Sequence, residues 1–591
     1  MNKETQTQKI AAINIIKNSR FLKLFYLYKK KIFILFILSL FSSSFVLIGP
    51  YFSKLFIDKA FINRDLSKFL NLSILGAAVF IFSTLARLAE DIIKNKIAIK
   101  LRLNLAGKFI KKFFSLDLEF FQSKSVGENI YRLSDTESIS NFILEQCPSF
   151  LLDISKLPIL LGLCLWLNMP MTIFFLALSP LFIIPNAYLQ KKLRPLYEEI
   201  WKYSAQLSKH IYEVFSKILI IKAFGLESYQ RRAYARTLIN NIRWSIRSFR
   251  WAIISSLSSS VLSKAVFGGI ALYGGWLIIK GRLSIGSYTA VMLYLKQLGG
   301  LFMSLGDRFG HFIRQAVSFD KFFEVMDIQP RIKDIAGAKT LRPVKGEVCF
   351  KGISFGYQKE KAIFKELDLS IPAFSWTAIA GPSGCGKTTL VNLILRLYEP
   401  WKGGIFLDGF DLKTIKLSSL REGIAIATQQ PLLFDVSIRE NISYGLKGIS
   451  QDEIEASAGI ASVHDFITRL PCGYDSLIGE DACRLSQGLK QRIALARAIL
   501  RNARLLILDE ATSSVDSLTE EKIFRALRQK RQGLSTIIIS HRLFSIKDAD
   551  RIYFLEDGKI EEGTHNQLLS ESKPYRDFFR NQMEEKNEND G

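Results

Sequence analysis

The stretch GPSGCGKTT, residues 381–389, decides the fold of the second half of the chain. It follows the apolar segment WTAIA (376–380) and leads into LVNLILRL (390–397), so the order of patterns is strand, glycine-rich loop and helix. This is the context that the pattern G-x-x-x-x-G-K-[S/T] requires in order to form a phosphate-binding loop. The sequence therefore predicts an α/β P-loop NTPase domain from about residue 340.

Most of the marked positions of this loop have an expected role. The three glycines let the backbone curl so that its N–H groups face phosphate oxygens. Lys387 is expected to reach the β- and γ-phosphates of ATP, and Thr388 to hold Mg²⁺. Cys385 fills a variable position and receives no chemical role. The predicted nucleotide-binding residues of the loop are Gly381, Pro382, Ser383, Gly384, Cys385, Gly386, Lys387, Thr388 and Thr389.

A second apolar strand, in RLLILDEATSSVD (504–516), ends in two acids. Taken alone, paired acids after a strand are more typical of a helix cap. After a P-loop, however, an acid at the carboxyl end of such a strand suits Mg²⁺ coordination, which we assign to Asp509. Glu510 beside it is the candidate general base that polarises an attacking water.

The first half of the chain has the pattern of a membrane domain. Hydrophobic residues make up 48% of the sequence, yet charged residues still reach 23%, which indicates an apolar part joined to a soluble part. Most of the apolar runs approach the roughly 20 residues that a spanning helix needs. They lie at about 32–52, 69–88, 150–167, 171–189, 257–279 and 287–305. The sequence predicts an all-α transmembrane domain (1–329) with six spanning helices, then a nucleotide-binding domain (340–580) and a polar tail (581–591).

The formal net charge of +25 is compatible with a nucleic-acid partner, but its distribution favours a membrane protein. Basic residues gather before the first span and in the two long loops, roughly 89–149 and 190–256. Under the positive-inside rule, both loops and both termini are then cytoplasmic, and the chain is a multi-pass protein of the inner membrane. This explains much of the charge without nucleic acid. The six cysteines show no C-x-x-C pair, so a disulfide framework or zinc site is not expected.

The order of these motifs resembles that of ATP-binding cassette (ABC) exporter half-transporters of the lipid-flippase and multidrug type, across nearly the whole chain. Tyr357, in ISFGYQ, matches the aromatic residue that stacks on adenine. Gln429, in ATQQPLLF, matches the glutamine that senses Mg²⁺ and the attacking water. Asp516 matches the acid of the loop that crosses to the partner, and His541, in SHRL, matches the switch histidine near the γ-phosphate. The resemblance implies an ATPase coupled to transport.

The segment LSQGL (485–489) occupies the place of the family signature, usually L-S-G-G-Q. Taken alone, the segment has the pattern of a helix start with an ordinary N-cap at Ser486. The resemblance implies that Ser486, Gln487 and Gly488 close over the γ-phosphate held by the P-loop of a second nucleotide-binding domain. One such domain per chain then implies a dimer with two ATP molecules between the facing domains.

The signature departs from the family pattern at Gln487 and at Leu489, where a polar side chain that orients the loop is missing. Two interpretations follow. A homodimer is favoured, because every residue expected to touch phosphate or metal is present. Alternatively, the chain pairs with a different half-transporter, and its altered signature faces a site that need not turn over.

The expected mechanism is a population shift, in which ATP favours the closed arrangement and the membrane helices turn outward. By resemblance, interruptions near 117–127 and 221–228 are coupling helices; a simple turn between two long helices is the alternative. Basic residues within or near the spans are costly and usually functional, or else they snorkel to the headgroups. If they face a cavity, they favour an acidic amphiphile such as a lipid A-like lipid; multidrug efflux remains the other possibility. They are Lys296, Arg87, Lys264 and Arg308.

Overall fold

The computed structural model describes residues 19–123, 126–341, 344–358, 361–479, 485–556 and 558–580. The chain divides into two compact units, Met1–Gln329 and Pro330–Gly591, and each is described by itself. The predicted polar tail, 581–591, lies outside the described residues, as does Lys17, one of the basic residues before the first predicted span.

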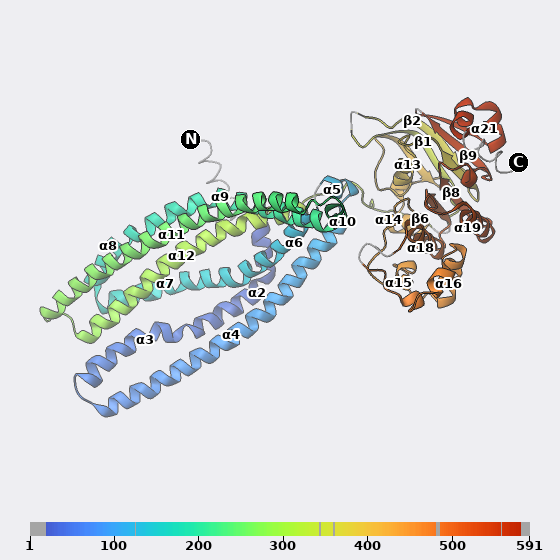
Figure 1. Ribbon diagram of the computed structural model, residues 1–591. Helices are drawn as coiled ribbons and strands as arrows, with labels where there is room; N and C mark the ends of the chain where they lie inside the picture. Colours follow the sequence, from blue (N-terminus) through green and yellow to red (C-terminus); the bar gives the residue numbers. More distant parts are fainter. Residues whose placement is uncertain are drawn as a thin grey trace. The chain divides into compact units, whose positions relative to one another are not determined.

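The first unit consists of long helices that run alongside one another (Figure 1). Its long helices are α2 (Ser19–Ser42), α3 (Ser44–Leu55), α4 (Leu66–Phe114), α7 (Cys147–Leu167), α8 (Met169–Leu178), α9 (Pro180–Ser216), α11 (Glu227–Ile279) and α12 (Ile285–Met326). Shorter pieces join them: a π-helix (Phe56–Phe61), α5 (Leu118–Ser123), α6 (Val126–Asn141), a second π-helix (Phe142–Gln146) and α10 (Ile218–Ala223).

Four stretches of the described residues are long and apolar enough to cross a membrane: Lys29–Phe61, Leu66–Phe114, Val126–Leu167 and Glu227–Ile279. The fourth predicted span falls on α8 and α9, which separate at Ser179 because Pro180 begins a new helix. The sixth falls on α12, whose apolar pattern is interrupted by polar residues such as Lys296. The count of six spans therefore remains a prediction.

Several helices are far longer than a bilayer is thick. With a rise of about 1.5 Å per residue, the 49 residues of α4 extend roughly 74 Å, against a hydrocarbon core of about 30 Å. The predicted loops 89–149 and 190–256 accordingly consist mainly of helices that continue from the apolar segments.

The interruptions predicted near 117–127 and 221–228 each contain a glycine, Gly127 and Gly225, and the two have different roles. Gly225 has a φ of 62° and forms the turn between α10 and α11. Gly127 instead lies within α6, and a Cβ built there would come within 2.4 Å of the Lys209 backbone on α9. Gly127 thus permits close packing of two helices rather than a turn.

The second unit is built on two sheets. The larger has six strands in the order β10-β9-β3-β8-β7-β6, parallel except for β10. Its strands are β3 (Trp376–Ala380), β6 (Ile424–Ala427), β7 (Leu505–Asp509), β8 (Ser535–Ile539), β9 (Arg551–Glu556) and β10 (Lys559–Gly563). Every residue of β3, β7 and β8 is buried, as expected for parallel strands that are covered on both faces.

The smaller sheet is antiparallel, in the order β2-β1-β4-β5. Its strands are β1 (Val348–Phe355), β2 (Phe364–Ile371), β4 (Lys402–Leu407) and β5 (Phe410–Asp411). The helices of this unit include α13 (Lys387–Ile394), α16 (Gln451–Ile460), α18 (Gln487–Leu500) and α19 (Ser517–Lys530). The fold prediction, a helical membrane domain followed by an α/β P-loop domain, is confirmed.

Candidate functional site

The glycine-rich loop joins β3 to α13 at the carboxyl end of the strand, where ligands bind in open α/β sheets. Gly386, the residue before α13, has a φ of 108°, which favours glycine. Gly381 has a φ of 144°, and a Cβ there would come within 2.2 Å of the Leu555 carbonyl oxygen. At both positions the loop's path therefore requires glycine.

Lys387, the first residue of α13, lies folded under the loop. Its Nζ donates to the carbonyl oxygens of Gly381 and Pro382, each at 2.8 Å, and only 7% of the residue is exposed. The ammonium group is thus held by the loop whose N–H groups are expected to meet phosphate. Cys385 packs against the hydrophobic core that the two sheets share, and its Sγ lies 3.8 Å from Lys387 Nζ.

Thr388 and Asp509 come together although they are 121 residues apart in the sequence. The Thr388 hydroxyl donates to the Asp509 carboxylate at 3.5 Å. Burial raises the pKa of the Asp509 carboxyl above its ordinary value, and the bond from Thr388 acts in the opposite direction. Two oxygen ligands at the base of the loop match the preference of Mg²⁺.

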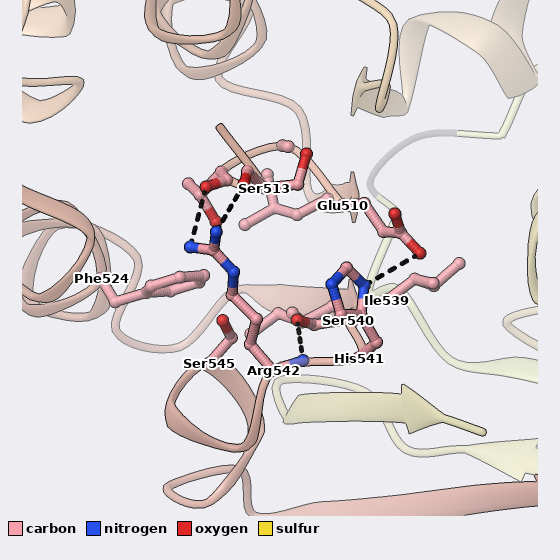
Figure 2. Close-up of a pocket in the computed structure, with 12 residues that line it drawn as sticks. Glu510, Ser513, Phe524, Ile539, Ser540, His541, Arg542 and Ser545 are labelled. Atoms are coloured by element: carbon pink, nitrogen blue, oxygen red, sulfur yellow. Dashed lines mark hydrogen bonds and ion pairs between the residues drawn. The ribbon is translucent and has the colours of Figure 1, made fainter. Parts of the chain in front are cut away.

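Glu510 follows directly on β7 and faces two other predicted residues. Gln429 Nε2 donates to its carboxylate at 2.5 Å. His541 Nδ1 lies 3.4 Å from the same carboxylate (Figure 2). The backbone of Glu510 is strained, with a φ of 49°. The structure therefore brings the three predicted catalytic side chains together from the ends of β6, β7 and β8.

Tyr357 lies beside α13, and 49% of the residue is exposed. Its hydroxyl lies 3.3 Å from the Thr389 hydroxyl and accepts a hydrogen bond from Asn392 at 3.1 Å. The ring packs edge-on against Tyr398, at 5.1 Å between centroids. An exposed aromatic face held rigidly next to the loop is a suitable surface for stacking a base.

The signature segment forms the start of α18. Ser486 is the N-cap, and its hydroxyl accepts from the Leu489 N–H at 3.3 Å. Leu489 packs against the core of the larger sheet, so the departure from the family pattern replaces a polar side chain by an apolar contact. The φ of Gln487 is not positive, so the backbone at this position does not require the glycine of the family pattern.

Gly488 is the position where α18 leaves no room for a side chain. A Cβ there would come within 2.7 Å of the Ser514 carbonyl oxygen. Because the obstacle is backbone, we expect Gly488→Ala to displace the segment after Glu510 and to lower ATPase turnover about 10-fold or more. Gly459→Ala, a helical glycine with open space around it, is the matched control for an ATPase assay. Equal turnover in the two variants would contradict this packing argument.

Asp516 has a structural role in addition to its predicted contact with the partner. Its carboxylate caps α19 and accepts from the Thr519 N–H at 2.9 Å. This backbone hydrogen bond lowers the pKa of the exposed carboxyl. The role in a partner contact stays a prediction.

Sequence reasoning missed two residues that hold these loops in place. Gln491, on α18, is 1% exposed and bonds to both the Gln429 and Ser513 segments. Arg542 donates to the Ser513 carbonyl oxygen at 2.5 Å (Figure 2). It also donates to the Val515 carbonyl oxygen at 3.1 Å and to the buried Glu520 carboxylate at 2.9 Å. The only available signal was the position of Arg542 directly after His541.

The structure separates the four basic residues predicted for a substrate cavity. Lys264 and Lys296 both line one cavity of about 700 Å³ between α11 and α12. Arg308 is paired with Asp153 on α7, at 2.8 Å, which gives it a structural partner. Arg87 is exposed on α4 and does not line this cavity.

Comparisons with known proteins agree with this architecture. The model of the ABC transporter transmembrane region matches residues 32–302, and the ABC transporter model matches residues 364–513. The ATP-dependent lipid A-core flippase of Syntrophus aciditrophicus (strain SB) is 32% identical, over 92% of this chain and 90% of the relative. The leukotoxin translocation ATP-binding protein LktB of Mannheimia glucosida is 30% identical, over 91% of this chain and 76% of the relative.

A solved structure of a bacterial Atm1-family ABC exporter with ATP bound is also similar. Its TM-score is 0.86 at 26% sequence identity, and the match covers 94% of this chain and 98% of that chain. Apolar helices of membrane length joined to a P-loop domain define an ATPase coupled to transmembrane transport. The chain belongs to the ABC transporter family, as a multi-pass membrane exporter, and exporters of this fold are typically dimers.

Proposed function

We propose that this exporter moves an anionic amphiphile, such as a lipid A-like lipid, out of the cytoplasmic leaflet. The observation that carries the proposal is the cavity between α11 and α12, which combines Lys264 and Lys296 with Phe267, Met292 and Met303. A lysine within a span costs about 2.5–3.5 kcal/mol unless it faces water or a counter-charge. Two lysines beside apolar walls suit a ligand with an acidic head and hydrocarbon tails.

The names of the relatives include one that agrees with this substrate class and one that points to another. The similar protein of Syntrophus aciditrophicus is named a lipid A-core flippase, whereas that of Mannheimia glucosida is named for leukotoxin translocation. Multidrug efflux is the alternative for this chain, because aromatic and methionine side chains adapt to varied apolar compounds. Cationic drugs, however, are disfavoured beside two lysines.

The nucleotide site is proposed to work with the residues assigned above. Lys387 and the loop N–H groups would bind the phosphates, and Tyr357 the base. Thr388 and Asp509, joined by a hydrogen bond, would hold the Mg²⁺, which neutralises charge on the phosphates. Glu510 would orient the attacking water and accept its proton, with Gln429 and His541 holding the carboxylate in place.

The transport cycle follows from differential affinity. ATP binds better to two closed nucleotide-binding domains than to separated ones, and only that difference is able to shift the membrane helices outward. We propose a homodimer, in which Ser486, Gln487 and Gly488 of each chain close over the ATP held by its partner. A heterodimer with a second half-transporter is the alternative. We propose that the dimer lies in the inner membrane, and the positive-inside rule supports cytoplasmic termini.

The substrate proposal is tested by ATPase measurements on the purified chain in neutral-lipid nanodiscs. Titrated anionic lipid is expected to stimulate turnover severalfold, and a cationic dye is not. Lys296→Ala and Lys264→Ala are expected to reduce the stimulation but not basal turnover, because the two charges together attract the headgroup. Lys280→Ala, on the same helical hairpin but outside the cavity, is the matched control. Stimulation by the dye and not by the lipid would favour multidrug efflux and contradict the proposal.

A further inference from the structure

Gln491 is a buried amide that joins two separate loops of the nucleotide-binding unit. Its Nε2 donates to the Gln429 carbonyl oxygen at 3.1 Å and to the Ser513 hydroxyl at 2.9 Å. Its Oε1 accepts from the Ser514 N–H at 2.9 Å. Only 1% of the residue is exposed, and both ends of the amide are satisfied. A side chain with this many specific bonds determines where the two loops lie.

The two loops are the ones that carry Gln429 and Glu510. The Gln429 side chain donates to the Glu510 carboxylate at 2.5 Å. On the other side, the Ser513 N–H donates to the Glu510 carbonyl oxygen at 3.2 Å. Gln491 therefore holds the backbone at both ends of the contact between Gln429 and Glu510.

The segment after Glu510 is also held from its opposite side. Arg542 donates to the Ser513 carbonyl oxygen, and His541, its neighbour, points toward Glu510 (Figure 2). Arg542 also donates to the Val515 carbonyl oxygen. Residues 512–515 are thus fixed between Arg542 and Gln491. Because Gln491 lies one turn after Gly488 on α18, any movement of the signature segment reaches this loop through a rigid helix.

We propose that Gln491 is a positioning residue that fixes Gln429 and Glu510 relative to each other and ties the signature segment of α18 to them. The proposal rests on the catalytic roles proposed for Gln429 and Glu510, and it adds the means by which they are aligned. Gln491 touches neither nucleotide nor water in this account; it acts through the two loops.

The test measures basal ATPase of the full chain in lipid, without transported substrate. Gln491→Met preserves side-chain volume but removes every hydrogen bond. We expect kcat to fall about 10-fold or more, because displacement of catalytic groups by ~1 Å costs up to 10²-fold. The KM for ATP is expected to stay within about twofold. Ser457→Ala is the matched control, since this buried serine of α16 bonds only within its own helix.

A second variant distinguishes the loss of these hydrogen bonds from a failure to fold. Gln491→Glu keeps the acceptor for the Ser514 N–H but is unable to donate to the Gln429 carbonyl oxygen. It too is expected to lower kcat without raising KM. If either folded variant, checked by thermal unfolding, has the parental kcat, or if KM alone changes, Gln491 is a packing residue and the proposal is overturned.

A double-variant cycle separates positioning from a general effect. If Gln491 acts through Gln429, then Gln491→Met added to Gln429→Ala lowers kcat by much less than it does alone. Fully multiplicative effects would overturn this route of action. The experiment is independent of the substrate proposal, because no amphiphile is added. Full turnover in Glu510→Gln, by contrast, would remove the catalytic assignment itself and not only the role of Gln491.

Discussion

Glu510→Gln is expected to leave ATP binding within about threefold of the parent chain and to lower turnover by about 10²–10⁴-fold, the usual contribution of a general base. The amide has the size of the carboxylate and still accepts the hydrogen bond that Gln429 now donates at 2.5 Å. It is unable to accept a proton from water at neutral pH. Phosphate release and nucleotide binding, measured on the same preparation, separate the two effects.

Glu521→Gln is the matched control for this variant. Glu521 lies on α19, near in sequence, and pairs only with Arg525 on the protein surface. Its replacement is expected to leave turnover unchanged, since exposed ion pairs contribute little. Normal phosphate release by Glu510→Gln would remove Glu510 from the role of general base.

Lys387→Ala is expected to lose nucleotide binding, by roughly 10–100-fold or more in affinity. A hydrogen bond to a charged group contributes about 1.5–3 kcal/mol, and 1.4 kcal/mol corresponds to a tenfold change in affinity. The ammonium group already lies under the loop, bonded to the Gly381 and Pro382 carbonyl oxygens. Binding of a fluorescent ATP analogue to the purified chain measures the change.

Lys365→Ala, on the surface strand β2, provides the control for a lost positive charge. Thermal unfolding without nucleotide shows whether Lys387→Ala also loosens the loop. Nucleotide affinity equal to that of the parent would remove the P-loop assignment, whatever the stability of the variant.

The parts of the site that could be predicted are those encoded by contiguous residues. The P-loop, the acids after β7 and the Ser486 cap are each formed by a few neighbouring residues, so their patterns indicate local structure directly. The predicted glycine turn at Gly225 belongs to the same class. By contrast, nothing in the sequence showed that Gly127 lies inside α6 and packs against Lys209, 82 positions later in the chain, while the chain turns earlier, between α4 and α5.

The parts that could not be predicted depend on contacts between distant segments. Gln491 reaches Gln429, 62 residues away, and nothing in the sequence around Gln491 marks that contact. The sequence predicts a substrate-binding role for Arg308, whereas in the fold it lies 2.8 Å from Asp153, 155 residues away. Pairing across such separations is set by tertiary packing. The sequence around one residue does not show which distant residue it will contact.

The central claim is that ATP is hydrolysed at a seam between two chains, and nanodiscs that hold either one or two copies of the purified chain test it most directly. In one-copy discs we expect ATP binding but turnover per chain reduced about 10-fold or more, because the signature residues of a partner are missing. Two-copy discs are expected to hydrolyse ATP at the full rate, as a homodimer requires. Equal turnover per chain in both preparations would contradict the account.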